Sequence, residues 1–401
     1  MVTLQKVAIV GASLAGLRAA ESLRRLGYQG RLLLVGAEKH LPYDRPPLSK
    51  EILQGRWDVD RLALRKRPYQ ELALDLRLGT RATRLDVAAR ELALDDGTRE
   101  RFDALVIASG AAPRRLPGQP ALEGVHLLRS LDDSLALRAA LERKPRVAVI
   151  GAGFIGAEVA ASCRARGLSV TLVEPLPAPL ARALGTEMGS VWAQLHLDHG
   201  VDLRCGVGVT AIEGAGRVER VVLSDGARVE VDLVVVGIGA APETGWLEGS
   251  GLALGDGVIC DSYCAAAPGI FAAGDVARWH NPLFDEVMRI EHWSNAVEQG
   301  TYVAERLAGS DLGAQPFAPV PFFWSDQYDA KIQFAGRMRG DDELRVVAGS
   351  LAQRKFTALY GRAGRLTGVL AMSRPRDLAR YRRLIAERAG FADAVAAASA
   401  G

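Results

Sequence analysis

The stretches VAIVGASLAG at residues 7–16 and VAVIGAGFIG at residues 147–156 are two versions of one pattern, an apolar run that enters a glycine-rich turn. Apolar runs without alternation are typical of parallel strands covered on both faces. In each copy a helical pattern follows at 17–26 or 157–166, and a second apolar strand follows at 31–35 or 169–174. Each copy therefore predicts the βαβ unit of a doubly wound sheet.

A second pair of segments repeats further along the chain. DGTRERFDALVIASGAAP at 96–113 and DGARVEVDLVVVGIGAAP at 225–242 share an Asp-Gly pair, a later Asp, a Gly and a final Pro, all offset by 129 residues. A single offset for all these landmarks indicates two copies of one structural unit. The Asp-Gly pairs predict hairpin corners between antiparallel strands laid on each sheet.

Both turns have the spacing of a pyrophosphate-binding loop. The first glycine of such a loop makes the tight turn, the second lets a phosphate approach the backbone, and the third lets helix and strand pack closely. The first copy has Gly11, Ser13 and Gly16, and the second has Gly151, Gly153 and Gly156. The serine is small, and its hydroxyl can itself donate to a phosphate. The alternative is that both turns only pack helix on strand.

An acidic residue follows each turn at a distance suited to ribose hydroxyls. Glu38 lies 22 residues past Gly16, and Glu174 lies 18 residues past Gly156. Two such turns predict two dinucleotides, and FAD with NAD(P) is the natural pair. The carboxylate of Glu174 would repel a 2′-phosphate, so we expect a preference for NADH. Arg182 is the one nearby cation that could swing toward a phosphate.

The remaining segments complete the domain organisation. GIFAAGD at 269–275 predicts a sharply ending strand, a helical pattern follows at 295–308, and short alternating strands from about 318 precede a basic helix at 376–390. We expect an α/β protein with two doubly wound dinucleotide-binding domains and a C-terminal α+β domain. The expected bounds are 1–113 with 243–317 for FAD, 114–242 for NAD, and 318–401 for the C-terminal domain.

Composition argues against several other classes. A net charge of +3 over 401 residues is too small to predict nucleic-acid binding, and no apolar stretch is long enough to span a membrane. The sequence shows no secretory leader, and four cysteines make no disulfide scaffold at this length, so we expect the reducing cytoplasm. Cys260 and Cys264 have C-x3-C spacing without a nearby histidine, and we expect no metal site.

Several longer segments carry a family resemblance over essentially the whole chain. They are GASLAG (11–16), PYDRPPLSK (42–50), GAGFIGAEVA (151–160), GIFAAGDVARW (269–279), RIEHWSNAVEQG (289–300) and FFWSDQY (322–328). In this order they resemble the FAD-dependent, NADH-dependent ferredoxin reductases that serve bacterial cytochrome P450s and Rieske oxygenases, which have the glutathione-reductase-type fold. Ser13 departs from the family's usual glycine without disturbing the other FAD positions.

The resemblance implies binding residues for both cofactors. For FAD they are Gly11, Ser13, Leu14, Ala15, Gly16, Glu38, Arg45, Pro46, Lys50, Ala82, Ala108, Ser109, Gly110, Arg129, Gly274, Asp275, His292, Trp293, Ala296 and Trp324. For NAD they are Gly151, Gly153, Phe154, Ile155, Gly156, Glu158, Glu174, Arg182, Ile238 and Gly239. Asp275 could instead be a helix N-cap, and the two tryptophans could be core aromatics.

Lys50 and Glu158 are the candidate catalytic residues. The resemblance implies that the acid reaches the lysine beneath the flavin, where a buried charge pair would tune the flavin and place the nicotinamide. The alternative is a surface lysine and an unrelated glutamate at a helix start. Because no cysteine precedes Cys163, we expect electrons to leave the flavin without a thiol relay.

The expected reaction is hydride transfer from NADH to FAD, followed by one-electron delivery to a [2Fe–2S] ferredoxin. Residues 318–401 hold 14 Lys and Arg against 8 Asp and Glu, which would suit an acidic ferredoxin. An NADH oxidase or other small-molecule flavin reductase is one alternative, and an NADH-sensing interaction protein is another. We expect a monomer or weak dimer without nucleic-acid or membrane partners.

Overall fold

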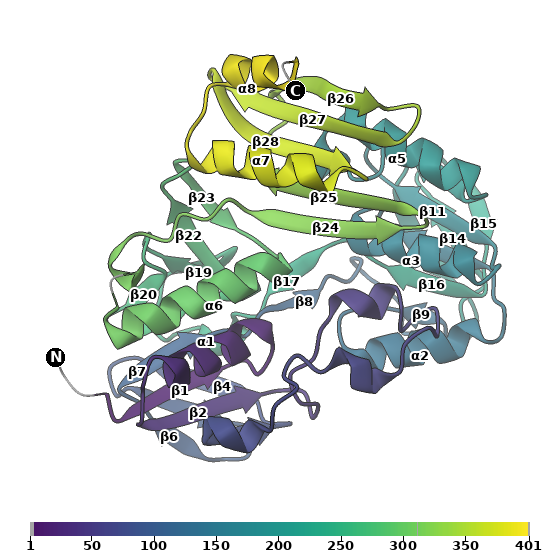
Figure 1. The fold of residues 1–401 in the computed structure, drawn as a ribbon. Coiled ribbons are helices and arrows are strands. Elements are labelled where there is room, and N and C mark those ends of the chain that lie inside the picture. Colours follow the sequence, from purple (N-terminus) through teal and green to yellow (C-terminus); the bar gives the residue numbers. More distant parts are fainter. Residues whose placement is uncertain (1–3, 311, 400–401) are drawn as a thin grey trace. The chain divides into compact units, whose positions relative to one another are not determined.

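The chain is described here by a computed structural model over residues 4–310 and 312–399 (Figure 1). It divides into two units, each assembled from separate stretches of sequence. The first unit comprises Met1–Asp44, Leu62–Ala112 and Ala241–Pro321, and the second comprises Arg45–Arg61, Pro113–Ala240 and Phe322–Gly401. The three-domain bounds expected from the sequence stay a prediction.

A six-stranded sheet forms the centre of the first unit. Its order is β20 (Ala265–Ala267), β21 (Ile270–Ala272), β7 (Ala104–Ile107), β1 (Lys6–Val10), β2 (Arg31–Gly36) and β3 (Leu74–Leu78), parallel except for β20. Strands β1 and β7 are almost wholly buried, as their unbroken apolar runs predict. Helices α1 (Leu14–Arg25) and α6 (Trp293–Ala308) lie side by side in Figure 1.

The second unit repeats this plan with a five-stranded parallel sheet. Its order is β12 (Asp202–Cys205), β11 (Val170–Glu174), β10 (Val147–Ile150), β16 (Leu233–Val236) and β9 (Val125–His126). The unit also contains helices α2 (Leu131–Leu141), α3 (Phe154–Ala165), α4 (Ala181–Leu184) and α5 (Thr186–Asp198). The two βαβ units predicted from the repeated glycine turns are therefore confirmed.

The second repeated segment is confirmed as well. Three-stranded antiparallel sheets form from β4 (Ala82–Asp86), β5 (Glu91–Leu94) and β6 (Arg99–Arg101), and from β13 (Val209–Glu213), β14 (Arg220–Leu223) and β15 (Arg228–Glu230). The Asp-Gly pairs stand at hairpin corners, where Gly97 and Gly226 have φ of +84° and +86°. Smaller sheets pair β8 (Ala111–Pro113) with β17 (Ala240–Pro242), and join β18 (Leu254–Gly255), β19 (Gly257–Cys260), β22 (Ala277–Asn281) and β23 (Glu286–Arg289).

The aspartate shared by the two repeats has the same structural role in each. In the first copy the carboxylate of Asp103 accepts the backbone N–H of Lys6 at 2.8 Å, and in the second the carboxylate of Asp232 accepts that of Arg146 at 2.9 Å. Each aspartate therefore ties the end of its hairpin to the start of the strand that leads into the glycine turn, β1 in the first copy and β10 in the second. The Arg146 side chain hydrogen-bonds the same carboxylate and lowers the pKa of Asp232 to about 2.

Both helices after the glycine turns begin three residues earlier than predicted. They start at Leu14 and Phe154, with Ser13 and Gly153 as extended N-caps, whereas the sequence pattern placed their starts at residues 17 and 157. The expectation was wrong because the last glycine of each turn already has helical geometry. Its missing side chain conceals the helical pattern, while the packing against the strand sets where the helix begins.

The C-terminal segment forms a five-stranded antiparallel sheet. Its order is β24 (Phe322–Gln327), β25 (Ala330–Gly336), β28 (Arg365–Met372), β27 (Lys355–Arg362) and β26 (Glu343–Ser350), accompanied by α7 (Pro375–Ala386) and α8 (Phe391–Ser399). The predicted strands are present, and the predicted basic helix is present as α7, which ends at Ala386, four residues earlier than expected. Helix α7 buries Leu378, Tyr381 and Ile385 and leaves most of its charged side chains outside.

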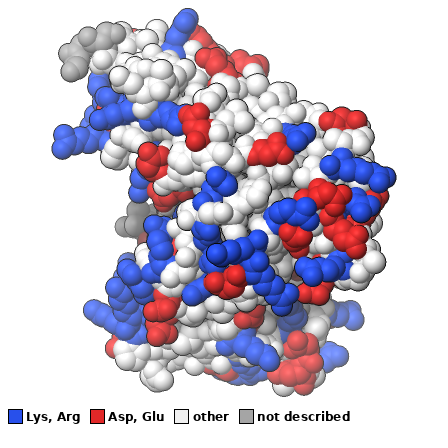
Figure 2. All heavy atoms as spheres, turned by 90° about the vertical axis from the view of Figure 1, so that its right-hand side faces the viewer, with Lys and Arg blue, Asp and Glu red and all other residues white. Residues whose placement is uncertain are grey.

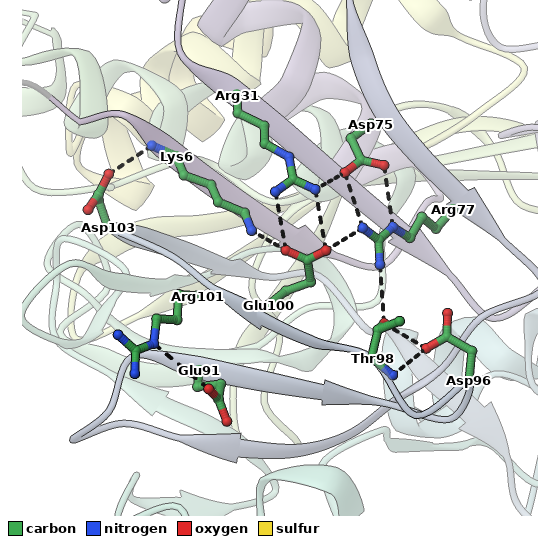
Figure 3. Close-up of polar contacts among 10 residues, drawn as sticks. All are labelled: Lys6, Arg31, Asp75, Arg77, Glu91, Asp96, Thr98, Glu100, Arg101 and Asp103. Atoms are coloured by element: carbon green, nitrogen blue, oxygen red, sulfur yellow. Dashed lines mark hydrogen bonds and ion pairs between the residues drawn. The ribbon is translucent and has the colours of Figure 1, made fainter.

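An ion-pair network joins three strands of the first sheet to strand β6; Lys6 and Arg31 are the first residues of β1 and β2, whereas Arg77 lies near the end of β3. Figure 3 shows the buried carboxylate of Glu100, from β6, between Lys6, Arg31 and Arg77 of strands β1, β2 and β3. Asp75 bridges the two arginines. Burial alone would raise the pKa of Glu100, but Lys6 and Arg77 hold it below its ordinary value.

Among the described residues, no helix is both long and apolar enough to cross a lipid bilayer.

Candidate functional site

The first glycine turn is closed by contacts between backbone atoms. Gly11 has φ +120°, and an ideal Cβ at this position would lie 2.0 Å from the carbonyl oxygen of Ala108. An ideal Cβ at Gly16 would lie 1.9 Å from the carbonyl oxygen of Gly11. Only glycine permits such approaches. The turn leads directly into α1, whose first N–H groups lack intrahelical partners and can hold a pyrophosphate.

The second turn has the same build. An ideal Cβ at Gly156 would lie 1.9 Å from the carbonyl oxygen of Gly151, and one at Gly151 would lie 2.5 Å from that of Gly237. Gly153, by contrast, is exposed, and an ideal Cβ there would meet nothing within 4 Å. The middle of this turn is therefore open to a phosphate, and the turn leads into the 12-residue helix α3.

The acids that follow the two turns do not occupy equivalent positions. Glu174 is the last residue of β11 and is buried; its carboxylate accepts the N–H of Ala152 in the turn at 2.7 Å and that of Leu176 at 3.0 Å. Glu38 lies beyond the end of β2 and accepts the hydroxyl of Tyr43. Thus Glu174 also fixes the backbone of its turn, a contact that sequence distance alone did not predict.

Lys50 and Glu158 form a buried ion pair in the second unit. The ammonium nitrogen Nζ of Lys50 lies 3.1 Å from Oε2 of Glu158, and the two residues are 7% and 6% exposed. Ser49 donates to the same oxygen at 2.5 Å, and Ser325 donates to Oε1 at 2.7 Å. The alternative of a surface lysine unrelated to the glutamate is therefore wrong. The carboxylate is compensated by one cation and two hydroxyl donors, which a buried charge requires.

The other residues expected around FAD lie partly in each unit. The first unit holds Gly11, Ser13, Leu14, Ala15, Gly16, Glu38, Ala82, Ala108, Ser109, Gly110, Gly274, Asp275, His292, Trp293 and Ala296, and the second holds Arg45, Pro46, Lys50, Arg129 and Trp324. In the first unit an ideal Cβ on Gly274 would lie 3.0 Å from the Cβ of Ala15 and 3.8 Å from that of Ala296, so these three positions meet.

Three of these residues had structural alternatives. Asp275 lies in a 3-10 turn, Gly274–Val276, that leads into strand β22, so it caps no α-helix. Trp293 is the first residue of α6 and donates its indole N–H to Asp44 at 2.7 Å. Trp324 lies in β24, stacked on Phe322. Both tryptophans are half-buried rather than fully buried core residues.

The FAD residues expected in the second unit include two arginines that meet. Arg45 precedes the short 3-10 helix Pro46–Ser49, and its guanidinium donates to the carbonyl oxygen of Arg129 at 2.8 Å. Ser130 then caps α2. This contact brings the two expected residues together through a backbone group.

The residues expected around NAD all lie in the second unit. Gly151 and Ile238 meet at the turn, Gly239 follows with φ +98°, and Leu180 donates its N–H to Ala152 at 3.0 Å, which ties the start of α4 to the turn. Ile155 is 45% exposed at the start of α3, and Phe154 packs against Phe323. Arg182 is exposed on α4.

All four cysteines are free thiols, and each is unsuited to thiolate chemistry. Burial raises the pKa of Cys163 to about 12, that of Cys205 to about 11 and that of Cys260 to about 12, and it also raises the pKa of Cys264. A reactive cysteine needs the opposite shift. The Sγ of Cys264 accepts a hydrogen bond from Gln299 at 3.2 Å, which fits a packing role.

Sequence reasoning missed the two serines that hold Glu158. Ser49 precedes Lys50 in the chain, and Ser325 lies within the segment FFWSDQY that carried part of the family resemblance. A possible signal was the alternation of β24, which places Ser325 and Gln327 on one face, where both are fully buried. Two polar residues on the buried face of a strand indicate partners inside the protein.

Comparisons with known proteins give one consistent result. Residues 5–300 match the family described as pyridine nucleotide-disulphide oxidoreductase, and residues 322–400 match the one described as reductase C-terminal. Rhodocoxin reductase from Rhodococcus erythropolis is 38% identical, over 95% of this chain and 89% of the relative. The ferredoxin–NAD(+) reductase component of the anthranilate 1,2-dioxygenase system from Burkholderia cepacia is 39% identical, over 94% of this chain and 93% of the relative.

Solved structures agree. A covalent putidaredoxin reductase–putidaredoxin complex matches with a TM-score of 0.91 at 34% identity, over 96% of this chain and 93% of that chain. A ferredoxin reductase from Rhodopseudomonas palustris matches with a TM-score of 0.91 at 39% identity, over 96% and 95% of the two chains. The fold predicted from the sequence is thereby confirmed.

Proposed function

This chain belongs to the pyridine nucleotide-disulphide oxidoreductase family, among its ferredoxin reductases, and we propose that it passes electrons from NADH through FAD to a [2Fe–2S] ferredoxin that feeds a cytochrome P450 or Rieske oxygenase. The observation that carries this proposal is the pair of glycine turns, each of which ends a buried parallel strand at a helix start. Two such turns in one chain suit two dinucleotides that exchange electrons.

The residues present fit FAD and NAD(H), the cofactors of this family. Each turn is closed by glycine contacts that a side chain would break, and each presents the first N–H groups of a 12-residue helix. Such a helix start favours a negatively charged pyrophosphate. The open position at Gly153 leaves room for a close approach of NAD.

The chain's own residues would bind the two dinucleotides, select NADH over NADPH and position a charge at the flavin. The turn at 11–16 would hold the FAD pyrophosphate and the turn at 151–156 that of NAD. The buried carboxylate of Glu174 would accept ribose hydroxyls and repel a 2′-phosphate. The ion pair of Lys50 and Glu158 would hold a fixed cation at the flavin edge, where it stabilises negative charge. Bound FAD supplies hydride acceptance and electron release in single steps.

Electron exit without a thiol relay follows from the state of the cysteines. Cys163 and Cys205 lie in the second unit, Cys260 and Cys264 lie in the first, and burial keeps the pKa of each thiol above its ordinary value. A protonated thiol is a poor nucleophile, so a dithiol intermediate is disfavoured. Transfer would therefore run directly from flavin to ferredoxin.

The docking partner is the finer part of the proposal. We infer an acidic ferredoxin, because residues 318–401 carry a net charge of +6 from their Lys, Arg, Asp and Glu residues, which would speed encounter with an acidic protein. Figure 2 shows one face of the molecule, on which basic side chains are interleaved with acidic ones. We further propose a cytoplasmic monomer or weak dimer.

Stopped-flow measurements test the proposal. Mixing with NADH should bleach the flavin first, and a ferredoxin should then be reduced in one-electron steps that slow steeply with added salt. A variant with all four cysteines changed to Ser or Ala should keep ferredoxin reduction within about threefold, because loss of a relay would cost orders of magnitude. Turnover with oxygen alone, without ferredoxin reduction, would instead identify an NADH oxidase.

A further inference from the structure

Polar side chains at the end of β24 connect Glu158 with residues farther from it, and the proposed function assigns these side chains no role. Ser325 and Gln327 lie on the buried face of this strand, and Tyr328 follows with φ +56°. This left-handed conformation is costly for a residue with a side chain, and it persists only where the surroundings compensate. Here it accompanies a hydrogen bond between the hydroxyl group of Tyr328 and Nδ1 of His196, at 2.9 Å.

The hydrogen bonds that link Gln327, Ser325 and Glu158 have one possible direction. A carboxylate only accepts, so Ser325 must donate to Oε1 of Glu158, at 2.7 Å. The serine hydroxyl has then used its only proton, and its oxygen accepts from Nε2 of Gln327 at 3.2 Å. This orientation of the amide leaves the carbonyl oxygen Oε1 of Gln327 as an acceptor on the other side.

His196 can supply a matching donor. Burial, with a smaller effect of His199, lowers the pKa of His196 to about 4, so the ring is neutral with one donor and one acceptor nitrogen. Its Nε2 and the Oε1 of Gln327 are both buried, and neither has a hydrogen-bond partner within residues 4–310 and 312–399, so each leaves a complementary polar group for the other. Gln327 acts to raise the pKa of the ring, as an acceptor of its N–H would.

We propose that Tyr328, His196, Gln327 and Ser325 form a one-directional chain of hydrogen bonds that positions Glu158 and stabilises its negative charge. Every donor in the chain points toward the carboxylate, so the bonds polarise one another. Ser49 and Lys50 engage Oε2, while the chain engages Oε1, which fixes both oxygens of the carboxylate. All members belong to the second unit. The four residues of the chain are positioning residues, since they act through Glu158.

The outer end of the chain reaches a pocket. The ring of Tyr328 stacks on His199 with centroids 3.7 Å apart, and both residues line a pocket of about 410 Å³ together with Lys50, Arg164 and Asp326. His199 is held in turn by a hydrogen bond between its Nδ1 and the carbonyl oxygen of Leu195 at 2.8 Å. The stacked ring immobilises the tyrosine that starts the chain.

Histidine NMR of the FAD-loaded protein tests the chain without any ferredoxin. Six histidines give a tractable ¹⁵N spectrum, and His196→Gln identifies the resonance of His196 by its loss. We expect a neutral ring protonated on Nε2 throughout the neutral pH range. Ser325→Ala and Glu158→Gln should each shift the ring nitrogens of His196, although neither residue contacts it. A ring protonated on Nδ1, or one unaffected by both variants, would overturn the proposal.

The rate of flavin reduction by NADH tests whether the chain affects the reaction at Glu158. Of the two experiments, only this one rests on the proposed function. Ser325→Ala should slow flavin reduction at saturating NADH about tenfold, the scale of one hydrogen bond to a charged group, with half-saturation unchanged within about twofold. Ser325→Thr should restore the rate. The matched control is Ser134→Ala, because the Ser134 hydroxyl is equally buried in this unit but donates to the carbonyl oxygen of Leu48.

The two arms separate the possible failures. If the control slows flavin reduction as much as Ser325→Ala does, the chain has only a packing role and the proposal fails. If the NMR shifts occur but no ferredoxin is reduced, the proposed function fails while the chain stands.

Discussion

The two glycine turns have the same backbone contacts and differ in the side chains around them. In both, the first glycine donates its N–H to the neighbouring strand at 2.8 Å, and the third glycine abuts the carbonyl oxygen of the first. The strand registers make Gly36 the counterpart of Glu174. An ideal Cβ on Gly36 would lie 2.5 Å from the Cβ of Ala12, so the first copy has no space for the acid of the second.

This difference separates two kinds of constraint. Contacts between backbone atoms define the turn and require glycine at its ends in both copies. The two copies differ at the strand end, in Gly36 and Glu174, and at the middle of the turn, in Ser13 and Gly153. Side chains at these positions can distinguish one dinucleotide from another. Substitutions at the shared positions should therefore have larger effects than substitutions at the variable ones.

Replacing the third glycine of one turn by alanine should impair the dinucleotide site of that turn and leave the other site intact. Because the new Cβ of Gly156→Ala would overlap the carbonyl oxygen of Gly151, overpacking costs roughly 3 kcal/mol, and flavin reduction by NADH should fall about a hundredfold while FAD stays bound. Gly16→Ala should instead lose FAD. The flavin absorbance of the purified variants and stopped-flow reduction measure both effects.

Gly153→Ala is the matched control for these variants. It adds the same methyl group to the same turn at a position with open space, so FAD content should equal that of the parent protein. The loss of stability should stay within about 1 kcal/mol, the cost of alanine at a helix N-cap. Normal reduction of Gly156→Ala by NADH, or full FAD content in Gly16→Ala, would contradict the claim that backbone contacts define the turns.

Glu174→Gln tests the side chain found only in the second copy. Loss of the charge weakens the bonds to Ala152 and Leu176 and the hold on ribose, so kcat/KM for NADH should fall about tenfold to a hundredfold. The value for NADPH should fall less, because repulsion of the 2′-phosphate is also removed. Glu187→Gln, at an exposed position on α5, is the control. Equal use of NADPH by the parent protein would refute the assignment.

Glu100→Gln tests the ion-pair network found only in the first copy, where the second copy has Val229. Because the pKa of Glu100 is lowered from 4.5 in the folded state, its contribution is present above that value and is lost as pH falls through the lower folded one. The variant should lose about 2 kcal/mol of unfolding free energy at neutral pH.

The pH dependence distinguishes this loss from a packing effect. Denaturant unfolding of Glu100→Gln and of the parent should converge as the solution is acidified below the ordinary pKa. Glu123→Gln, which removes an exposed pair with Arg143, should change stability by less than about 1 kcal/mol. A constant difference at all pH values would rule out the electrostatic role.

The smallest effect is expected at the middle of the first turn. Ser13→Gly converts this copy to the pattern of the second, and an N-cap serine replaced by glycine costs only a few tenths of a kcal/mol. The side chain of Ser13 makes no capping hydrogen bond to α1, so Ser13→Ala should cost less than about 1 kcal/mol. Thermal melting and FAD affinity measure both; a large loss of FAD in Ser13→Gly would show that the serine hydroxyl is a main ligand.

The sequence predicted what repetition and periodicity encode. Both βαβ units, the Asp-Gly hairpins and most C-terminal strands follow from local patterns. The helix starts at Leu14 and Phe154 do not, because glycines conceal helical geometry. The contact of Glu174 with Ala152 and the approach of Ser325 to Glu158 join residues far apart in sequence, and tertiary packing alone determines them.

The candidate site residues also differed in how far the sequence could predict them. Lys50 and Glu158 were paired through family resemblance, since nothing local links residues 108 positions apart. Their serine partners carried only a weak signal, a buried polar face on β24. His196 carried none, because a single histidine on an amphipathic helix fits an ordinary surface position equally well.

The interleaved division of the chain affects how it can be made. The backbone passes from one unit to the other after residues 44, 61, 112, 240 and 321. During synthesis the first unit cannot be completed until residue 321 has left the ribosome, and the second still awaits its C-terminal sheet at that point. Neither unit corresponds to one continuous stretch of the coding sequence. Simple truncation cannot isolate either half, and genetic exchange between relatives would have to keep the segments from 45 to 61 and from 322 onward together.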